Sequence, residues 1–169
     1  MTKLTIRQAT ITDIPLIRAL ATEIFPHTYR HILSPEQIDY MMEWMYSEES
    51  LRTQMSTGHA FFIPEEEGTP IGYLSVQTED TDHYHLQKIY LLPTCQGKGY
   101  GKQVFQFAID YVHSVHPSPC TMQLNVNRYN TSALQFYQRM GMYKVNEGDF
   151  HIGHGYYMTD YIMEIKVGE

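Results

Sequence analysis

The stretch LPTCQGKGYGKQ, residues 92–103, joins a predicted strand to a predicted helix. Its glycines stand at alternate positions, Gly97, Gly99 and Gly101. Glycine adopts positive φ readily and lets a ligand come close to the backbone. In a loop that opens a helix, the amide N–H groups and the helix N-terminus together favour an anion. The stretch therefore indicates either a phosphate-binding loop or a tight turn that binds nothing.

The spacing of these residues excludes two common nucleotide-binding loops. A Walker A loop requires Ser or Thr directly after its lysine, whereas Gln103 follows Lys102. The dinucleotide fingerprint G-x-G-x-x-G, counted from Gly97, requires a glycine where Lys102 stands. If the loop binds phosphate, it therefore serves another phosphate carrier.

Hydrophobic periodicity on both sides of the loop predicts a mixed α/β fold. Alternation and short apolar runs predict strands near residues 4–7, 60–63, 71–76, 84–92, 122–126, 142–146 and 156–166. Helical spacing predicts helices after Thr12 or Asp13, after a capping box at Ser34–Gln37, after Ser47, after the glycine loop and near Ala133. This order indicates a single domain over residues 1–169, with a mostly antiparallel first half and a β-α-β second half.

Composition and charge narrow the class of protein. Hydrophobic residues make up 43% of the 169 residues and charged residues 18%, as in soluble globular proteins. No apolar run approaches the roughly 20 residues of a membrane span and no signal peptide is visible, so we expect a cytoplasmic protein that binds no membrane. A net charge of −7 argues against nucleic acid as a partner and permits a cationic ligand.

Cysteine and histidine spacing indicates neither a disulfide framework nor a metal centre. Cys95 and Cys120 form no CxxC motif, so we expect two reduced thiols. Spacings such as His83-x-His85 could ligate a metal, but no cysteine pair and no HExxH motif accompanies them. We therefore expect no bound metal.

Two longer patterns give the glycine loop a specific meaning. Residues 96–101 match Q/R-x-x-G-x-G/A, and residues 130–141 match N-x-x-A-x-x-x-Y-x-x-x-G. In both, the sequence resembles the GNAT superfamily of N-acetyltransferases, although Met142 stands where that family usually has Phe. The resemblance covers nearly the whole chain and implies acetyl-CoA as the cosubstrate. It also implies a mixed, mostly antiparallel sheet of about seven strands, with helices on both faces and splayed central strands.

The resemblance further implies which residues contact coenzyme A. The strand before the loop would bind the pantetheine arm through its backbone, and the glycine loop would bind the pyrophosphate. The expected coenzyme-binding residues are Ile89, Tyr90, Leu91, Gln96, Gly97, Lys98, Gly99, Tyr100, Gly101, Lys102, Asn130 and Tyr137. Asn130 is also a good helix N-cap, and the two roles can coexist.

Acetyl transfer to an amine needs a base for the amine and a donor for the leaving thiolate. The resemblance assigns the donor to Tyr137, whereas its residue pattern alone would fit a core tyrosine on an apolar helix face. For the base, His85 shares one strand face with His83 and Gln87. A neutral imidazole could take the proton directly or through water, but a partly exposed histidine without a catalytic role fits the pattern equally.

The expected acceptor is a polyamine or another small cationic amine, because segments 23–36 and 157–163 resemble bacterial polyamine N-acetyltransferases. Glu23 could pair with a distant ammonium and Tyr29 could contact it by a cation–π interaction, although Glu23 also fits a solvated helix position. Three other functions stay open: a protein N-terminal acetyltransferase of the ribosomal-protein type, a non-catalytic acyl-CoA sensor, and an oligomeric interaction protein. The last would use the apolar stripe at 38–46, and the chain could form a homodimer.

Overall fold

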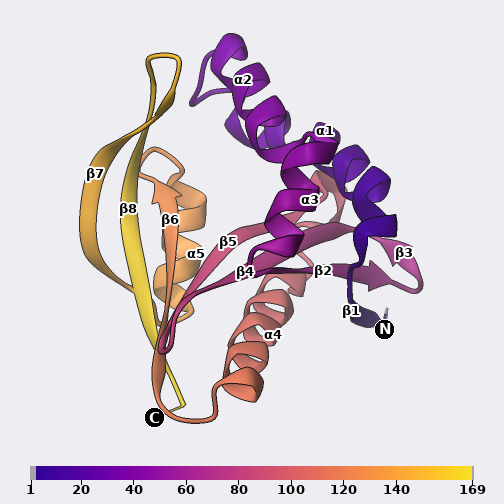
Figure 1. Ribbon diagram of the computed structural model, residues 1–169, viewed down its shortest axis with the longest axis vertical. Coiled ribbons are helices and arrows are strands. Elements are labelled where there is room, and N and C mark those ends of the chain that lie inside the picture. Colours follow the sequence, from indigo (N-terminus) through magenta and orange to yellow (C-terminus); the bar gives the residue numbers. More distant parts are fainter. Residues whose placement is uncertain (1–2, 169) are drawn as a thin grey trace.

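The computed structural model describes residues 3–168, which form one sheet of eight strands (Figure 1). In chain order the strands are β1 (Leu4–Gln8), β2 (His59–Glu66), β3 (Thr69–Pro70), β4 (Gly72–Asp80), β5 (His83–Leu91), β6 (Cys120–Asn127), β7 (Tyr143–Gly153) and β8 (Tyr156–Val167). Seven of them follow the order β1-β2-β4-β5-β6-β8-β7, and β3 pairs with β2. All these pairs are antiparallel except β5 with β6, which confirms the predicted fold class.

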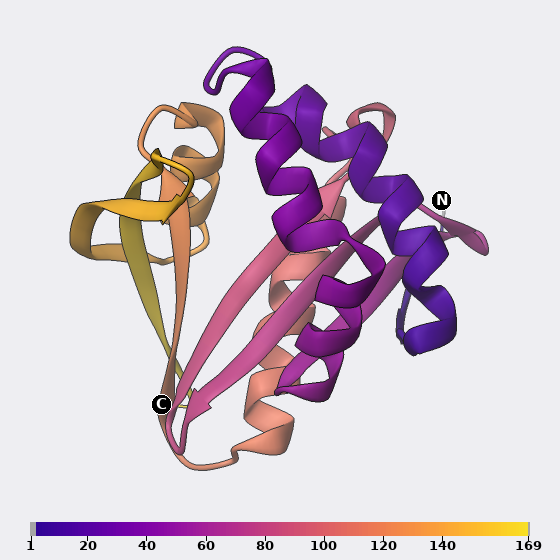
Figure 2. The ribbon, with the colours of Figure 1, turned by 45° about the horizontal axis from the view of Figure 1, so that its top comes forward.

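The α-helices of the described residues cover both faces of the sheet (Figure 2). They are α1 (Ile14–Tyr29), α2 (Pro35–Tyr46), α3 (Glu48–Ser56), α4 (Tyr100–Val115) and α5 (Thr131–Arg139). One buried hydrophobic cluster lies under α1–α3 and a second lies under α4 and α5. None of the helices in residues 3–168 combines the length and the hydropathy that a membrane span requires.

Two of the predicted helix caps are present. Ser34 Oγ accepts a hydrogen bond from the N–H of Gln37, and Ser47 Oγ accepts one from the N–H of Ser50, both at 3.1 Å. Gln37 does not return a bond to Ser34 as a capping box requires. Its Nε2 instead donates to the carbonyl of Tyr157 in β8 at 2.8 Å. This contact ties α2 to the other half of the sheet.

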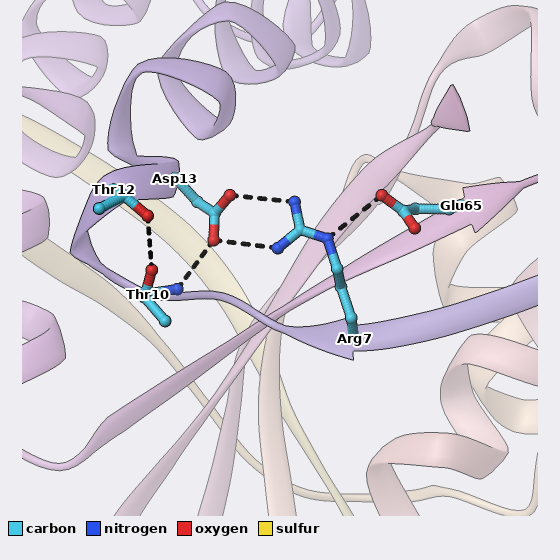
Figure 3. Close-up of polar contacts among 5 residues, drawn as sticks. All are labelled: Arg7, Thr10, Thr12, Asp13 and Glu65. Atoms are coloured by element: carbon cyan, nitrogen blue, oxygen red, sulfur yellow. Dashed lines mark hydrogen bonds and ion pairs between the residues drawn. The ribbon is translucent and has the colours of Figure 1, made fainter. Parts of the chain in front are cut away.

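A network around Arg7 fixes the start of α1 against the edge of the sheet (Figure 3). Both terminal nitrogens of Arg7 donate to the Asp13 carboxylate at 3.0 Å, and its Nε donates to Glu65 at 3.2 Å. Asp13 also accepts from the N–H of Thr10 at 2.9 Å. These bonds lower the pKa of Asp13, with Arg7 as the main cause. The sequence predicted a simple cap here, whereas the structure has a short 3-10 turn over residues 11–13 before α1.

The central parallel strands separate soon after they pair. β5 and β6 are joined over three residue pairs, of which His85 with Gln123 is the last. Beyond this pair β5 continues along β4 and β6 continues along β8, and the two strands diverge (Figure 1). We call the region between residues 86–91 of β5 and residues 124–127 of β6 the wedge. It is the splay that the sequence resemblance implied.

A bulge in β5 changes which side chains share a face. Between Ser75 and Val76 of β4, the register skips one residue of β5, Gln87. Strict two-residue alternation along β5 would point Lys88 away from α1–α3, but the extra residue reverses the phase beyond it. Lys88 consequently donates a hydrogen bond to Gln54 in α3 at 2.6 Å. The predicted alternation along β5 therefore holds only up to the bulge.

Candidate active site

The glycine loop leads from β5 into α4, as the sequence predicted. Gly97 and Gly99 both have φ of +80°, and apart from their own chain neighbours no heavy atom of residues 3–168 lies within 4 Å of the place where a Cβ would stand. The backbone conformation therefore requires glycine there, and the space beside the backbone is open. Gly101 instead faces the ring of Phe136 in α5 at 3.5 Å. Because the first N–H groups of α4 have no acceptor within the helix, the loop offers backbone donors and a positive helix end to a phosphate.

Two of the longer side chains of this loop contact the same carboxylate on β2. Lys98 forms an ion pair with Glu66 of β2 at 3.4 Å, and the Tyr100 hydroxyl also donates to Glu66. Tyr100 is buried in the core under α4, so its backbone is the part that can face a ligand. Lys102 lines a groove of about 500 Å³ against β1. Backbone N–H groups are therefore the principal anion-binding groups of the loop.

The end of β5 forms one side of the wedge. Residues 89–91 pair with β4 along one edge, and past His85 no strand among residues 3–168 pairs with the other edge. Gln96 closes the end of the strand, because its Nε2 donates to the carbonyl of Leu91 at 3.3 Å. An extended arm can bind to such an unpaired edge in the manner of an added strand.

Helix α5 brings Tyr137 to the wedge. The Tyr137 ring lies 5.4 Å from Phe136 and 6.2 Å from Phe105, and the residue is 9% exposed. Burial raises the pKa of Tyr137 far above neutral, so the hydroxyl stays protonated at pH 7. No side chain or backbone group in residues 3–168 forms a hydrogen bond with this hydroxyl. Asn130 occupies the N-cap of α5 without a capping hydrogen bond from its side chain.

Three tyrosines from different elements meet at the wedge: Tyr29 at the end of α1, Tyr90 in β5 and Tyr137. The hydroxyls of Tyr29 and Tyr90 are 3.2 Å apart. Burial is the main cause that raises the pKa of each of the three tyrosines. Each tyrosine is also close enough to affect the pKa of another by electrostatic interaction or hydrogen bonding. The Tyr29 ring packs on Phe25 at 4.7 Å and the residue is 8% exposed. Tyr29 therefore presents its hydroxyl, rather than an open ring face, to the site.

His85 and Glu23 lie apart from this group. His85 is on the last β5–β6 pair, at the closed end of the wedge, with its Nδ1 3.4 Å from Glu79 Oε1. Burial lowers the pKa of His85 and outweighs Glu79, which acts in the opposite direction. Strand geometry places Ile89 on the order of 10 Å away from His85. Glu23 is on the exposed face of α1, and the structure does not bring it to the tyrosines.

Asp160 is a residue of this site that the sequence analysis did not assign. It lies in β8, is 6% exposed and pairs in register with Asn127 at the end of β6. Its Oδ2 accepts a hydrogen bond from Asn125 at 3.2 Å. Asp160 is near enough to Tyr29 to raise the pKa of that tyrosine. Two-residue alternation along this strand could have revealed Asp160, because its carboxylate stands between Met158 and Ile162 on one strand face.

Metal-ligating and thiol groups do not gather here. Within residues 3–168, no three His, Cys, Asp or Glu side chains are grouped so that they could hold a metal ion. Cys95 and Cys120 are free and buried.

Comparison with known sequences identifies the family of this chain. Residues 17–142 match the Acetyltransferase (GNAT) family. A protein of Lactobacillus delbrueckii subsp. lactis named "uncharacterized N-acetyltransferase in pepI 3′ region" is 28% identical, over 97% of this chain and 98% of its own. The spermidine N(1)-acetyltransferase of Thermoplasma acidophilum is 28% identical, over 95% of this chain and 96% of its own.

A solved structure with the same fold contains a ligand that suits the glycine loop. The PaiA N-acetyltransferase of Thermoplasma acidophilum, in complex with coenzyme A, superimposes with a TM-score of 0.78 at 25% identity. The match covers 96% of this chain and 98% of that one. Coenzyme A carries the pyrophosphate for which the open backbone at Gly97 and Gly99 is suited. The chain thus belongs to the GNAT family and is an acetyltransferase that uses acetyl-CoA as its cosubstrate.

Proposed function

We propose that this protein acetylates a primary amine of a polyamine or another small cationic amine. The observation that carries the proposal is the wedge, where the unpaired edge of β5 leads to the glycine loop and Tyr90 of that strand lies near Tyr137. The spermidine N(1)-acetyltransferase relative supports the choice of acceptor. The net charge of −7 supports it too, because an acidic protein attracts a polycation.

The coenzyme would be held mainly by backbone groups. In our proposal the loop residues 96–102 bind the pyrophosphate, residues 89–91 bind the pantetheine arm, and Asn130 contacts the coenzyme from the start of α5. Acetyl-CoA supplies an acetyl group that its thioester makes reactive toward amines. The remaining tasks, which are to orient the amine, remove its proton and stabilise the leaving sulfur, belong to side chains.

Tyr137 is the group that we propose for the leaving sulfur. Burial keeps its hydroxyl protonated, which a hydrogen-bond donor needs. An ordinary thiol has a pKa of about 8.5, well below that of this buried phenol, so full proton transfer from Tyr137 to a thiolate would be uphill. The hydroxyl therefore acts by donating a hydrogen bond to the sulfur, and the sulfur can take its final proton from water.

His85 is the base that we propose for the amine. Its lowered pKa keeps the imidazole neutral at pH 7, so it can accept a proton. Because it lies at the closed end of the wedge, it would act through water rather than by direct contact. Tyr29 would contact the acceptor through its hydroxyl, and Glu23 would attract a distant ammonium from the surface of α1.

Direct attack by the amine, without an acetylated protein intermediate, suits the positions of the thiols. Cys95 and Cys120 are 7% and 5% exposed and pack in the core under α4 and α5. Burial raises the pKa of Cys120, which keeps its thiol protonated and a poor nucleophile. Neither thiol is thus suited to carry an acetyl group.

The position of α2 favours a small acceptor over an extended peptide. The Tyr40 hydroxyl donates to the carbonyl of Ile152 at 2.7 Å, and Gln37 donates to the carbonyl of Tyr157. A Cβ at Gly153 would lie 2.2 Å from the Tyr40 hydroxyl, so this contact is close. Both bonds tie α2 to the β7–β8 hairpin on the face of the sheet that carries α1–α3, which restricts access there.

The test is thiol release from acetyl-CoA with a panel of acceptors: spermidine, an uncharged amine and a peptide with an N-terminal alanine. We expect saturable release with spermidine and little with the peptide. Release with the peptide alone would support a protein N-terminal acetyltransferase instead. Coenzyme A binding without release for any acceptor would support a sensor. The cytoplasmic location, the homodimer and the single domain over residues 1–169 stay predictions.

A further inference from the structure

Asp160 is a buried carboxylate that no cationic side chain of the described residues contacts. Its Oδ2 accepts one hydrogen bond from Asn125, whereas its Oδ1 is fully buried and has no hydrogen-bond partner among residues 3–168. Arg128 acts on Asp160 only from a distance, because its guanidinium forms ion pairs with Glu147 and Asp149. Burial has the larger effect and raises the pKa of Asp160.

The strand register shows which way Asp160 points. Met158 lies two residues before it on the same face of β8 and belongs to the cluster under α1–α3. Tyr161 and Met163, on the opposite face, belong to the cluster under α4 and α5. Asp160 therefore faces α1 and α2, where its charge acts on Tyr29. It also lies beside the wedge, because its register partner Asn127 is the last residue of β6.

An unpaired carboxylate in this position disfavours folding. A buried polar atom without a hydrogen bond loses its hydration and gains nothing in return, and the loss is larger for a charged group. Glu164 provides a contrast on the same face of β8. Its two carboxylate oxygens accept hydrogen bonds from Gln123 at 2.8 Å and from Tyr143 at 3.1 Å. A cationic ligand beside Asp160 would supply the hydrogen-bond donor and the positive charge that the described residues do not provide.

We propose that Asp160 is the carboxylate that binds an ammonium group of the acceptor, with Tyr29 and Asn125 around it. This inference rests on the proposed function and adds to it the residue that selects a positively charged acceptor. Tyr29 and Tyr90 are hydroxyl-bearing neighbours that can share the N–H donors of the ammonium. The attacking amine would thus arrive from the face that carries α1–α3, while the coenzyme occupies the unpaired edge of β5.

The test measures binding and does not depend on turnover. Spermidine is titrated by calorimetry into protein saturated with coenzyme A, which carries no acetyl group. The proteins compared are wild type, Asp160→Asn, and Glu164→Gln as the matched control on the same strand face. We expect Asp160→Asn to weaken spermidine binding about tenfold or more and Glu164→Gln to change it less than about twofold. We also expect the melting temperature of Asp160→Asn to equal or exceed that of wild type, because a buried unpaired charge is removed.

Several results would overturn the inference. One is equal spermidine affinity in wild type and Asp160→Asn. Another is an equal loss of affinity in Asp160→Asn and Glu164→Gln. A third is a loss of affinity in Asp160→Asn together with a lower melting temperature or failure to fold. Absence of spermidine binding by wild type would also overturn it. Thiol release from acetyl-CoA with other amines would then show separately whether the proposed acetyltransferase function stands.

Discussion

At the scale of single residues, replacing Tyr137 with Phe removes one hydroxyl and leaves the ring packing on Phe105 and Phe136 in place. A hydrogen bond to the leaving sulfur is made as charge develops, so its loss lowers kcat rather than coenzyme affinity. We expect Tyr137→Phe to lower kcat by about tenfold or more, since one hydrogen bond contributes about 1.5 kcal/mol. Steady-state thiol release and coenzyme A binding, measured on the same preparation, check this.

Tyr84→Phe is the matched control for Tyr137. Tyr84 is buried in the same core cluster but lies near the closed end of the wedge, on a β5–β6 pair. Loss of the Tyr84 hydroxyl should leave kcat unchanged. An equal fall in kcat for both variants would show that the effect arises from core packing, and an unchanged kcat in Tyr137→Phe would remove Tyr137 from the mechanism.

Lys88 should make the free energy of unfolding depend on pH. It is 6% exposed, lies 5.3 Å from the centre of the Phe61 ring, and burial lowers its pKa from 10.5 to about 8. The unfolded chain therefore binds more protons than the folded chain between these two values, and stability rises with pH there. Between pH 7 and pH 9.5 we expect this group to add about 2 kcal/mol to the free energy of unfolding.

Urea unfolding of wild type and Lys88→Met at both pH values measures this contribution. The difference between the two proteins should change by that amount in favour of wild type at the higher pH. Lys144→Met, which removes a lysine that is 43% exposed, serves as the control and should follow wild type. If wild type and Lys88→Met respond to pH identically, Lys88 is not a buried cation with a depressed pKa.

The sequence predicted some residues of the site and not others, for a physical reason. Tyr137 and the glycines were assigned through the family resemblance, whose motifs each lie within one short segment of the chain. Asp160 was missed, because its neighbours Tyr29 and Asn125 lie on other elements and come together only through the sheet register. The direction of Lys88 was missed as well, since the bulge at Gln87 leaves no pattern in a single sequence.

At the scale of elements, the glycine loop depends on a backbone conformation. Gly99 has φ of +80° and open space around its Cβ position, so Gly99→Ala introduces strain without a clash. Such strain costs about 1–2 kcal/mol for a residue with a Cβ. If the loop relieves it by leaving the left-handed region, its N–H groups lose their alignment, and the Kd for coenzyme A should rise about tenfold.

Gly68→Ala is the control for this loop variant. Gly68 has φ of +85° and lies in the turn between β2 and β3. Among the described residues, only its chain neighbours come within 4 Å of its Cβ position. Gly68→Ala should lower the free energy of unfolding in urea about as much as Gly99→Ala does, while its affinity for coenzyme A stays at the wild-type value. Unchanged affinity in Gly99→Ala as well would mean that the loop conformation does not serve the coenzyme.

Most elements were predicted correctly because periodicity and caps are local. The predicted strands and helices all exist, and Ser34 and Ser47 cap the helices expected of them. Two local details differ. The side chain of Gln37 bonds to β8 instead of its own helix, and Asp13 bonds to Arg7 instead of capping α1, because tertiary partners compete with local ones.

At the scale of the whole molecule, the site exists because two half-sheets part at the β5–β6 pair. The separation begins after the pair His85–Gln123 and is a property of the strand register. No single residue of β5 or β6 predicts it. The resemblance to a known family implied it, whereas hydrophobic periodicity did not. Helices α4 and α5 pack on one face and α1–α3 on the other, and in our proposal these faces supply the coenzyme side and the acceptor side of the wedge.

The most direct measurement of the central claim is the initial rate of thiol release as both acetyl-CoA and spermidine are varied. Attack by the amine on acetyl-CoA in one ternary complex predicts double-reciprocal lines that intersect. Parallel lines, the signature of a covalent acetyl-enzyme, or a rate that does not depend on spermidine would contradict the account.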